Sequence, residues 1–140
     1  MAEIYPDEGL DAILSIYPKG GTYTAPLQLK LFKSQTATTV ITSGQTIGNI
    51  TETTYTSYAQ QALASATWGA VGAGSGGRKS TYPQVTFPTC GATGDTINGF
   101  YVTDNGVTKC ICQANFDDGL AVVLALNDII KVTPAQTFQS

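Results

Sequence analysis

The residues most able to carry chemistry lie in a glycine-rich segment. Residues 72–80 read Gly-Ala-Gly-Ser-Gly-Gly-Arg-Lys-Ser, a composition typical of loops in which backbone N–H groups and a lysine hold a nucleotide phosphate. In that motif the lysine directly follows a glycine, but here Arg78 separates Gly77 from Lys79. Residues 82–87 favour a strand, whereas a phosphate site needs the N-terminus of a helix. A nucleotide hydrolase using residues 72–80 is therefore the most distant alternative, and a mobile loop is the preferred interpretation.

Three cysteines, Cys90, Cys110 and Cys112, are the next candidates. A tetrahedral zinc site takes four ligands, usually Cys or His, and the chain has no histidine. We therefore predict no metal site. Cys110 and Cys112 are two positions apart on a predicted strand, so their side chains face the same way and are poorly placed to bond to each other.

A disulfide between Cys90 and Cys112 is the favoured pairing. Counting outward from a two-residue turn at Asn105-Gly106 places Cys112 beside Gly99, at the end of the hairpin away from the turn. Cys90 lies shortly before the loop that leads into this end, and a disulfide needs Cα atoms within about 7 Å. The alternative, in which the cysteines remain reduced and buried, stays open.

Aspartates form the last group that could act in catalysis. Paired carboxylates can hydrolyse glycosides, and the sequence contains Asp117-Asp118 together with Asp95, Asp104 and Asp128. All of them fall at predicted turns, where aspartate commonly caps backbone N–H groups. The absence of histidine also excludes Ser–His and Cys–His nucleophile pairs. We therefore predict no catalytic residue, no cofactor and no enzymatic activity.

The overall composition restricts fold and function further. The chain has 140 residues, a net charge of −3 and 12% charged residues, and this length suits one domain. The shortage of basic residues argues against a nucleic-acid partner, and no apolar run is long enough to span a membrane. The 21 threonines and 15 glycines favour strands and turns. We therefore predict an all-β fold, a single antiparallel β-sandwich or barrel-like domain.

The N-terminal segment is the exception to this β pattern. Leu10, Ile13, Leu14 and Tyr17 recur at helical spacing, and Pro6 and Pro18 suit the two ends of a short helix. The helix is too short to be stable alone. We predict that its stripe docks on a neighbouring subunit or a partner protein, with packing on its own sheet as the alternative. Residues 1–25 are assigned to this helix and a linker arm, and residues 26–140 to the β domain.

Alternation with a period of two defines the expected strands. Leu27, Leu29 and Leu31 alternate with polar residues, which predicts a strand with one buried face. The clearest hairpin is predicted around Asn105-Gly106. Its two strands are expected at 97–103 and 107–114, further strands at 55–66, 82–87, 120–126 and 129–133, and a flexible loop at 69–79.

Several of these segments carry sequences found in one group of proteins. They are Leu-Gln-Leu-Lys-Leu-Phe (27–32), Glu52–Leu63, Tyr-Pro-Gln-Val-Thr-Phe (82–87), Ile-Asn-Gly-Phe-Tyr-Val-Thr-Asp (97–104) and Asn-Asp-Ile-Ile-Lys-Val-Thr-Pro (127–134). Over residues 27–134 the chain resembles small accessory structural proteins of tailed bacteriophage particles. It departs from their pattern at Ser57, where glycine is usual, and at Cys110-Ile-Cys112, where an aromatic and an acidic residue are usual.

The resemblance implies a structural role in a virion and brings no catalytic residues. The expected function is that of a capsid decoration (cement) protein, which binds the outer shell and stabilises it. The alternative is a neck or tail-fibre component, including an adhesin that meets the host surface. The expected partners are the major capsid protein or another virion protein and further copies of this chain, with neither nucleic acid nor a membrane. The expected location is the virion, on the capsid surface, after assembly in the host cytoplasm.

Overall fold

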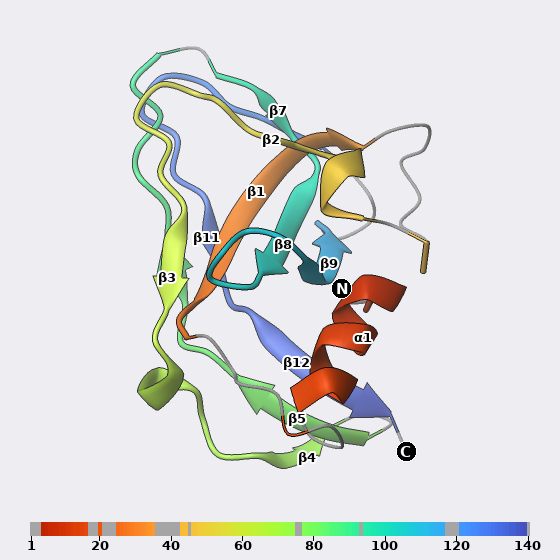
Figure 1. The fold of residues 1–140 in the computed structure, drawn as a ribbon. Coiled ribbons are helices and arrows are strands. Elements are labelled where there is room, and N and C mark those ends of the chain that lie inside the picture. The colour runs from red at the N-terminus through yellow and green to blue at the C-terminus, as the bar shows by residue number, and fades with distance from the viewer. Residues whose placement is uncertain are drawn as a thin grey trace.

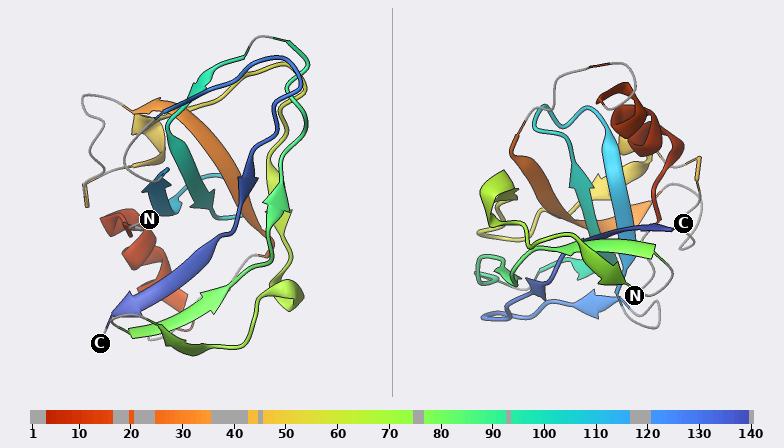
Figure 2. Two further views of the ribbon diagram at one scale, coloured as in Figure 1. Left: turned by 180° about the vertical axis from the view of Figure 1, so that it is seen from behind. Right: turned by 90° about the horizontal axis from the view of Figure 1, so that it is seen from below.

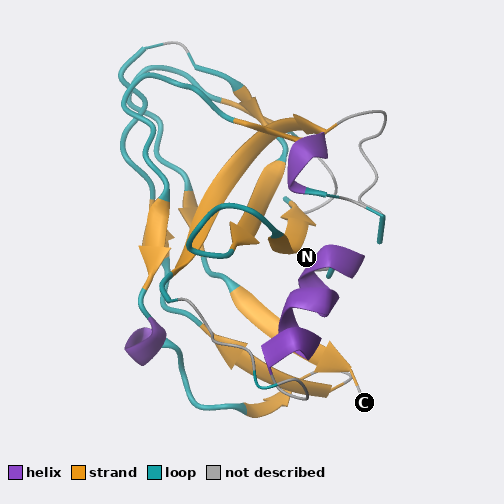
Figure 3. Ribbon diagram, in the orientation of Figure 1, coloured by secondary structure: helices purple, strands orange, loops and turns teal. Residues whose placement is uncertain are grey.

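The computed structural model is built mostly from antiparallel β-strands, with one α-helix (Figures 1 and 3). It describes residues 4–16, 20, 25–35, 43–44, 46–74, 77–92, 94–116 and 121–139. The helices are α1 (Asp7–Ile16) and the 3₁₀-helices η1 (Ile47–Asn49) and η2 (Ser65–Thr67). The strands are β1 (Leu27–Gln35), β2 (Ile50–Glu52), β3 (Gln61–Leu63), β4 (Gly72–Gly74), β5 (Gly77–Thr81), β6 (Val85–Thr86), β7 (Thr96–Ile97), β8 (Gly99–Thr103), β9 (Cys110–Asn115), β10 (Val122–Val123), β11 (Lys131–Val132) and β12 (Ala135–Gln139).

The central sheet has the strand order β2-β1-β8-β9, and β3 also pairs with β1. β1 runs antiparallel to β8, with Leu29 opposite Val102 and Phe32 opposite Gly99. The three leucines of β1 are buried, as their alternation predicts. The opposite face is buried as well, because Phe32 and Tyr101 belong to a second apolar cluster there. The expectation that β1 buries one face alone is therefore wrong.

Three of the small sheets are consecutive stretches of one long antiparallel ribbon, in which residues 77–97 run alongside residues 122–139. β5 pairs with β12, β6 with β11 and β7 with β10. Backbone hydrogen bonds continue the pairing between these stretches; for example, Phe87 N donates to Ile130 O at 2.9 Å. In Figures 1 and 2 the two segments rise together from the β5–β12 end to a tip at the far side of the molecule.

Prolines account for the interruptions in this ribbon. Pro83, Pro88 and Pro134 lie within the paired segments, and proline has no N–H to give to a ladder. Where an N–H group remains, the pairing resumes, as in the 2.8 Å hydrogen bond from Tyr82 N to Pro134 O. The ribbon is therefore continuous in path although it is broken into short strands.

A gap in the central sheet is closed by a tyrosine side chain. β2 and β3 pair with opposite ends of β1, and the segment between them leaves the sheet. At the gap, Leu31 N donates to Tyr58 Oη (3.2 Å), and the Tyr58 hydroxyl donates to Glu52 Oε1 (2.9 Å). Glu52 Oε2 accepts from Lys30 Nζ at 2.8 Å, and the Lys30 side chain is 6% exposed. Burial raises the pKa of Tyr58 well above its usual value, so the hydroxyl keeps the proton that it donates.

The hairpin of β8 and β9 forms where the sequence predicts it, but its register differs. Gly99 lies opposite Asn115 and not opposite Cys112. The reason is that the Asp104 carboxylate organises a longer connection, in which its Oδ1 accepts from Lys109 N at 2.7 Å. The Asp104 side chain thus accepts hydrogen bonds from N–H groups that, with a two-residue turn, would pair with the opposite strand.

Other predicted segments are also corrected. The stretch expected to be a flexible loop over 69–79 contains β4 and the start of β5, which pair as a hairpin with Ala73 opposite Arg78. The stretch expected to be a strand over 55–66 contains the three-residue β3, because the chain before it follows the ribbon to the tip. Within the described part of 120–126, the strand is confined to β10.

α1 forms where its stripe predicts it, and it packs on β9. Glu8 Oε1 accepts hydrogen bonds from Ile47 N (2.8 Å) and Cys110 N, so one carboxylate connects the helix with two other elements. Gly9 is buried at the contact, and a Cβ there would lie 2.7 Å from Cys110 O and closer still to Ile111 O. The glycine that weakens the helix locally is therefore what allows it to approach the sheet.

We predict that Tyr58→Phe destabilises the protein. The change leaves the Leu31 N–H and one Glu52 oxygen without the hydroxyl that both now contact, which costs about 1–3 kcal/mol. Chemical denaturation monitored by tryptophan fluorescence measures the loss. Tyr55→Phe is the matched control, because its hydroxyl donates to the single acceptor Pro88 O. Equal stability of Tyr58→Phe and the wild type would contradict the assigned role.

We also predict that Gly9→Ala lowers stability, although alanine favours a helix over glycine by about 1 kcal/mol. The added methyl group meets backbone atoms of β9, which cannot turn aside as a side chain can, so the net cost should be about 1–3 kcal/mol. Gly48→Ala is the control, because its nearest neighbour would be Thr46 Oγ1 at 3.9 Å. A stabilised Gly9→Ala variant would show that α1 does not approach β9 this closely.

Candidate functional site

The glycine-rich segment has a geometry unlike that of a phosphate loop. β4 and β5 form an antiparallel hairpin, and β5 continues through Tyr82 into the ribbon with β12. The Arg78 guanidinium donates from Nη2 to Val71 O at 3.3 Å. Since no helix follows β5 within the residues that the structure describes, its backbone N–H groups do not converge at a helix N-terminus to receive a phosphate.

The three cysteines are free thiols, and all are buried. Cys90 Sγ donates to Ala92 O at 2.6 Å. The register of the hairpin places Cys112 opposite Val102, three positions nearer the connection than expected, or about 10 Å along the strand. The argument for a Cys90–Cys112 disulfide therefore fails, and these two residues are not bonded. Burial, with the nearby Glu8 charge, raises the pKa of the Cys110 thiol to about 12, which makes it a poor nucleophile.

Three of the candidate aspartates cap backbone groups, as their position in turns predicts. Asp95 accepts from Thr54 N, Asp104 from Lys109 N and Asp128 from Ala125 N, at 2.6, 2.7 and 2.7 Å. Asp117 and Asp118 lie outside the described residues. Within the part of the chain that the structure describes, no cluster of Cys, Asp or Glu is placed to hold a metal ion.

The feature that stands out on the surface is a set of large apolar side chains at the end of the ribbon. Val123 is 70% exposed, Leu126 57%, Ile129 50% and Val122 41%. We call these four residues the apolar tip. The exposed fractions are high for valine, leucine and isoleucine, which are normally buried. Because four exposed apolar side chains fall within residues 122–129, this segment is the candidate surface for contact with another molecule.

A tight turn holds the apolar tip in a fixed shape. Asp128 N donates to Ala125 O (3.1 Å), and Asp128 Oδ2 accepts from Ala125 N (2.7 Å). Asn127 has a φ of +72°, a conformation that asparagine tolerates better than most residues. Its N–H donates to Cys90 O at 2.9 Å, which joins the turn to the other ribbon segment. Leu126 therefore lies on a turn that is held by hydrogen bonds within itself and by one to the neighbouring ribbon segment.

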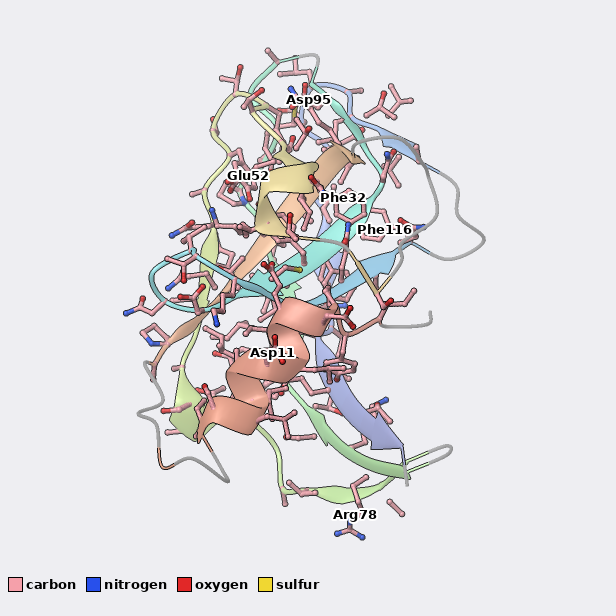
Figure 4. All side chains as sticks on the ribbon, turned by 45° about the vertical axis from the view of Figure 1, so that its right-hand side comes forward. Asp11, Phe32, Glu52, Arg78, Asp95 and Phe116 are labelled. Carbon is pink, nitrogen blue, oxygen red and sulfur yellow. The ribbon has the colours of Figure 1, made fainter. Side chains whose placement is uncertain are left out.

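Asp95 fastens the base of the tip to the central sheet (Figure 4). Its Oδ2 accepts from Thr54 N (2.6 Å) and Thr53 Oγ1 (2.8 Å), and its Oδ1 forms an ion pair with Lys33 Nζ of β1 (3.4 Å). Leu124 N donates to the Asp95 backbone carbonyl at 3.2 Å. These hydrogen bonds, led by the one from Thr54, lower the pKa of the Asp95 carboxyl below its usual value.

Aromatic packing supports the tip from below. The Tyr58 and Phe87 rings stack with centroids 6.1 Å apart, and the Tyr55 ring meets Tyr58 edge-on at 5.3 Å. Leu124, directly before the turn, is buried in the same apolar core. The turn that carries Leu126 is thus held by hydrogen bonds and packing within the chain.

The predicted stripe of α1 is divided by the fold. Ile13 is half-buried and packs against the main core, whereas Leu10 and Leu14 are 40% and 56% exposed. Tyr17 lies outside the described residues. α1 packs on its own sheet. Docking of the exposed half of the stripe on a second molecule stays a prediction.

Sequence reasoning missed the apolar tip. Residues 120–126 have the length and apolar character of a buried strand, so the exposure of Val123 and Leu126 carries no local signal. The turn at 125–128 did have a local sequence signal, because Asn127-Asp128 is a pair that favours turns.

Comparison with known proteins gives no match to any family model, curated protein sequence or solved structure. In the described part of the chain, no helix is both long enough and apolar enough to cross a membrane.

We predict that the contribution of Asp95 to the free energy of unfolding is lost at low pH. Its pKa is lowered in the folded state from 3.8, so its contribution is complete above that value and is lost as the pH falls through the folded pKa. Asp95→Asn should cost about 1–3 kcal/mol at pH 7 and less at pH 3. Urea denaturation from pH 3 to pH 7 measures this difference.

The control for this experiment is Asp11→Asn, an exposed site on α1 whose side chain has no partner among the described residues. In high salt, which screens contacts between exposed charges on different copies, it should follow the wild type at every pH. A stability gap between Asp95→Asn and the wild type that stays constant with pH would contradict the assignment.

Proposed function

We propose that the protein is a structural component of a tailed bacteriophage particle that decorates the outside of the capsid shell and stabilises it. The observation that carries this proposal is the apolar tip, which exposes Val123, Leu126 and Ile129. The sequence resemblance over residues 27–134 supports the virion as its location. The hydrogen-bonded aspartates and the buried thiols fit a role that rests on contact rather than on catalysis.

Binding through the apolar tip follows from its energetics. Full burial of each partly exposed side chain contributes on the order of 1 kcal/mol. The turn at 125–128 is already closed by hydrogen bonds, so little conformational entropy is lost when it docks. The partner that fits is a protein with an apolar pocket on its outer surface.

A repeated shell turns a modest contact into a stabilising one. Each copy that binds the assembled shell more tightly than its separate subunits lowers the free energy of the assembled state. Many equivalent sites multiply this effect, and no chemical step is needed. A neck or tail-fibre position uses the same kind of contact in few copies, so the number of copies per particle separates the two locations.

We also propose that the β-elements form one barrel-like unit. One core cluster supports this, because it includes Leu29 of the central sheet, Phe87 and Val132 of the ribbon, and Leu124 below the tip. Strands from both halves of the chain therefore enclose the same apolar interior.

We predict that Leu126→Ser combined with Ile129→Ser weakens binding to shells that lack the protein by at least about tenfold, a loss of roughly 1.4 kcal/mol or more. Co-sedimentation of purified protein with such shells, read as copies bound at saturation and half-saturation, measures it. Ala62→Ser combined with Ala66→Ser is the control, since both residues are exposed and lie outside the apolar tip and α1, and it should reach the wild-type saturation level.

Electron microscopy with antibody labelling gives the location independently. Label over the whole head surface agrees with decoration. Label confined to the neck or tail overturns the capsid assignment, and normal shell binding by the double variant overturns the role of the tip.

A further inference from the structure

The carboxylates of the structure are almost all used within the chain. Five described acidic side chains accept hydrogen bonds or ion pairs from their own fold: Glu8, Glu52, Asp95, Asp104 and Asp128. The other two, Asp7 and Asp11, have no side-chain partner within the described residues, and both are exposed on α1. Asp7 lies in the first turn, where the helix dipole favours it, but Asp11 lies beyond that turn.

These two aspartates alternate with the exposed leucines of the same helix. Asp7, Leu10, Asp11 and Leu14 occupy positions i, i+3, i+4 and i+7, which form one face of a helix. We call this face the helix stripe. Gly9, on the other side of α1, is held against β9, so the stripe is fixed in direction. In Figure 4 Asp11 lies on the outer side of α1.

A surface of opposite charge lies on the hairpin of β4 and β5. Val71 is 61% exposed, and the Arg78 guanidinium is held beside it by the hydrogen bond to Val71 O. Ala73 lies opposite Arg78 on β4, so its side chain is on the same face. We call these three residues the wing patch. Among the described residues Arg78 forms no ion pair with a carboxylate.

We propose that the helix stripe of one copy docks on the wing patch of a second copy, with Asp11 pairing with Arg78 and Leu10 and Leu14 covering Val71. Charge complementarity selects a second copy as the occupant, because each surface offers what the other lacks. A guanidinium can hold a carboxylate through two parallel hydrogen bonds, and the leucines exclude water from that pair. The proposal does not depend on the proposed function.

The two surfaces belong to different sides of the molecule. In Figure 4 the Arg78 side chain projects outward from the end of the molecule that lies opposite the tip. The Asp11 side chain projects outward from α1. The stripe and the patch are two different surfaces, so the proposed contact joins unlike surfaces of two copies. Each copy carries one of each surface, so two copies can exchange both contacts across a twofold axis, or successive copies can join head-to-tail into a ring or a filament.

Sedimentation velocity over a range of protein concentrations tests the proposal. The wild type should self-associate, and more weakly as salt rises, because exposed charges are screened. Asp11→Lys and Arg78→Glu should each weaken the association at least about tenfold, since each places like charges opposite one another. A mixture of the two variants should associate again, because both possible contacts between unlike partners then join opposite charges.

Lys79→Glu is the matched control, since Lys79 is the neighbour of Arg78 on β5, faces the other side of the strand and undergoes the same change of charge. It should associate as the wild type does. The proposal is overturned if the wild type is monomeric at low salt, if Lys79→Glu weakens association as much as Arg78→Glu, or if the mixed variants remain monomeric.

Discussion

The pairing of residues 77–97 with residues 122–139 is the constraint on which the other parts of the structure depend. It joins stretches that are far apart in sequence, and it encloses the hairpin of β8 and β9 between them. Once the ribbon is closed at Ile97 and Val122, the enclosed hairpin is placed so that β8 can pair with β1. Backbone hydrogen bonding dictates this arrangement, because every buried N–H and C=O must find a partner.

The central sheet shows how the same requirement is met where strands are missing. The segment after Glu52 leaves β1 to reach the tip. Without a further acceptor, the Leu31 N–H would be buried without a hydrogen-bond partner. The Tyr58 hydroxyl accepts a hydrogen bond from that N–H and donates one to Glu52, which also forms an ion pair with the buried Lys30. A polar network of this kind stabilises a fold when all its members are satisfied and is costly when one is removed.

The two exposed apolar surfaces, the apolar tip and the outer face of α1, result from the way the chain packs its core. The ribbon must turn at its far end, and Asp95 and Asp128 fix that turn so that Leu126 and its apolar neighbours project from it. α1 is drawn to β9 by Gly9 and Glu8, which turns Leu10 and Leu14 outward. Both apolar surfaces are therefore by-products of interactions made elsewhere, and they are available for contacts between molecules.

Local patterns in the sequence were sufficient for several features. The spacing of apolar residues determined α1, the alternation of leucines determined β1, and the Asn105-Gly106 signal determined that β8 and β9 form a hairpin. Each of these depends on neighbours within a few positions, where propensity and periodicity act.

Tertiary structure alone decided the register of that hairpin, the ribbon, the close approach at Gly9 and the exposure of the tip. The register depends on Asp104 reaching N–H groups several residues away, and the ribbon depends on pairing between distant segments. Whether Leu126 is buried depends on which other segments cover it, and a run of apolar residues is the same in either case. Long-range pairing and burial leave no periodic trace in the chain, so only the folded structure determines them.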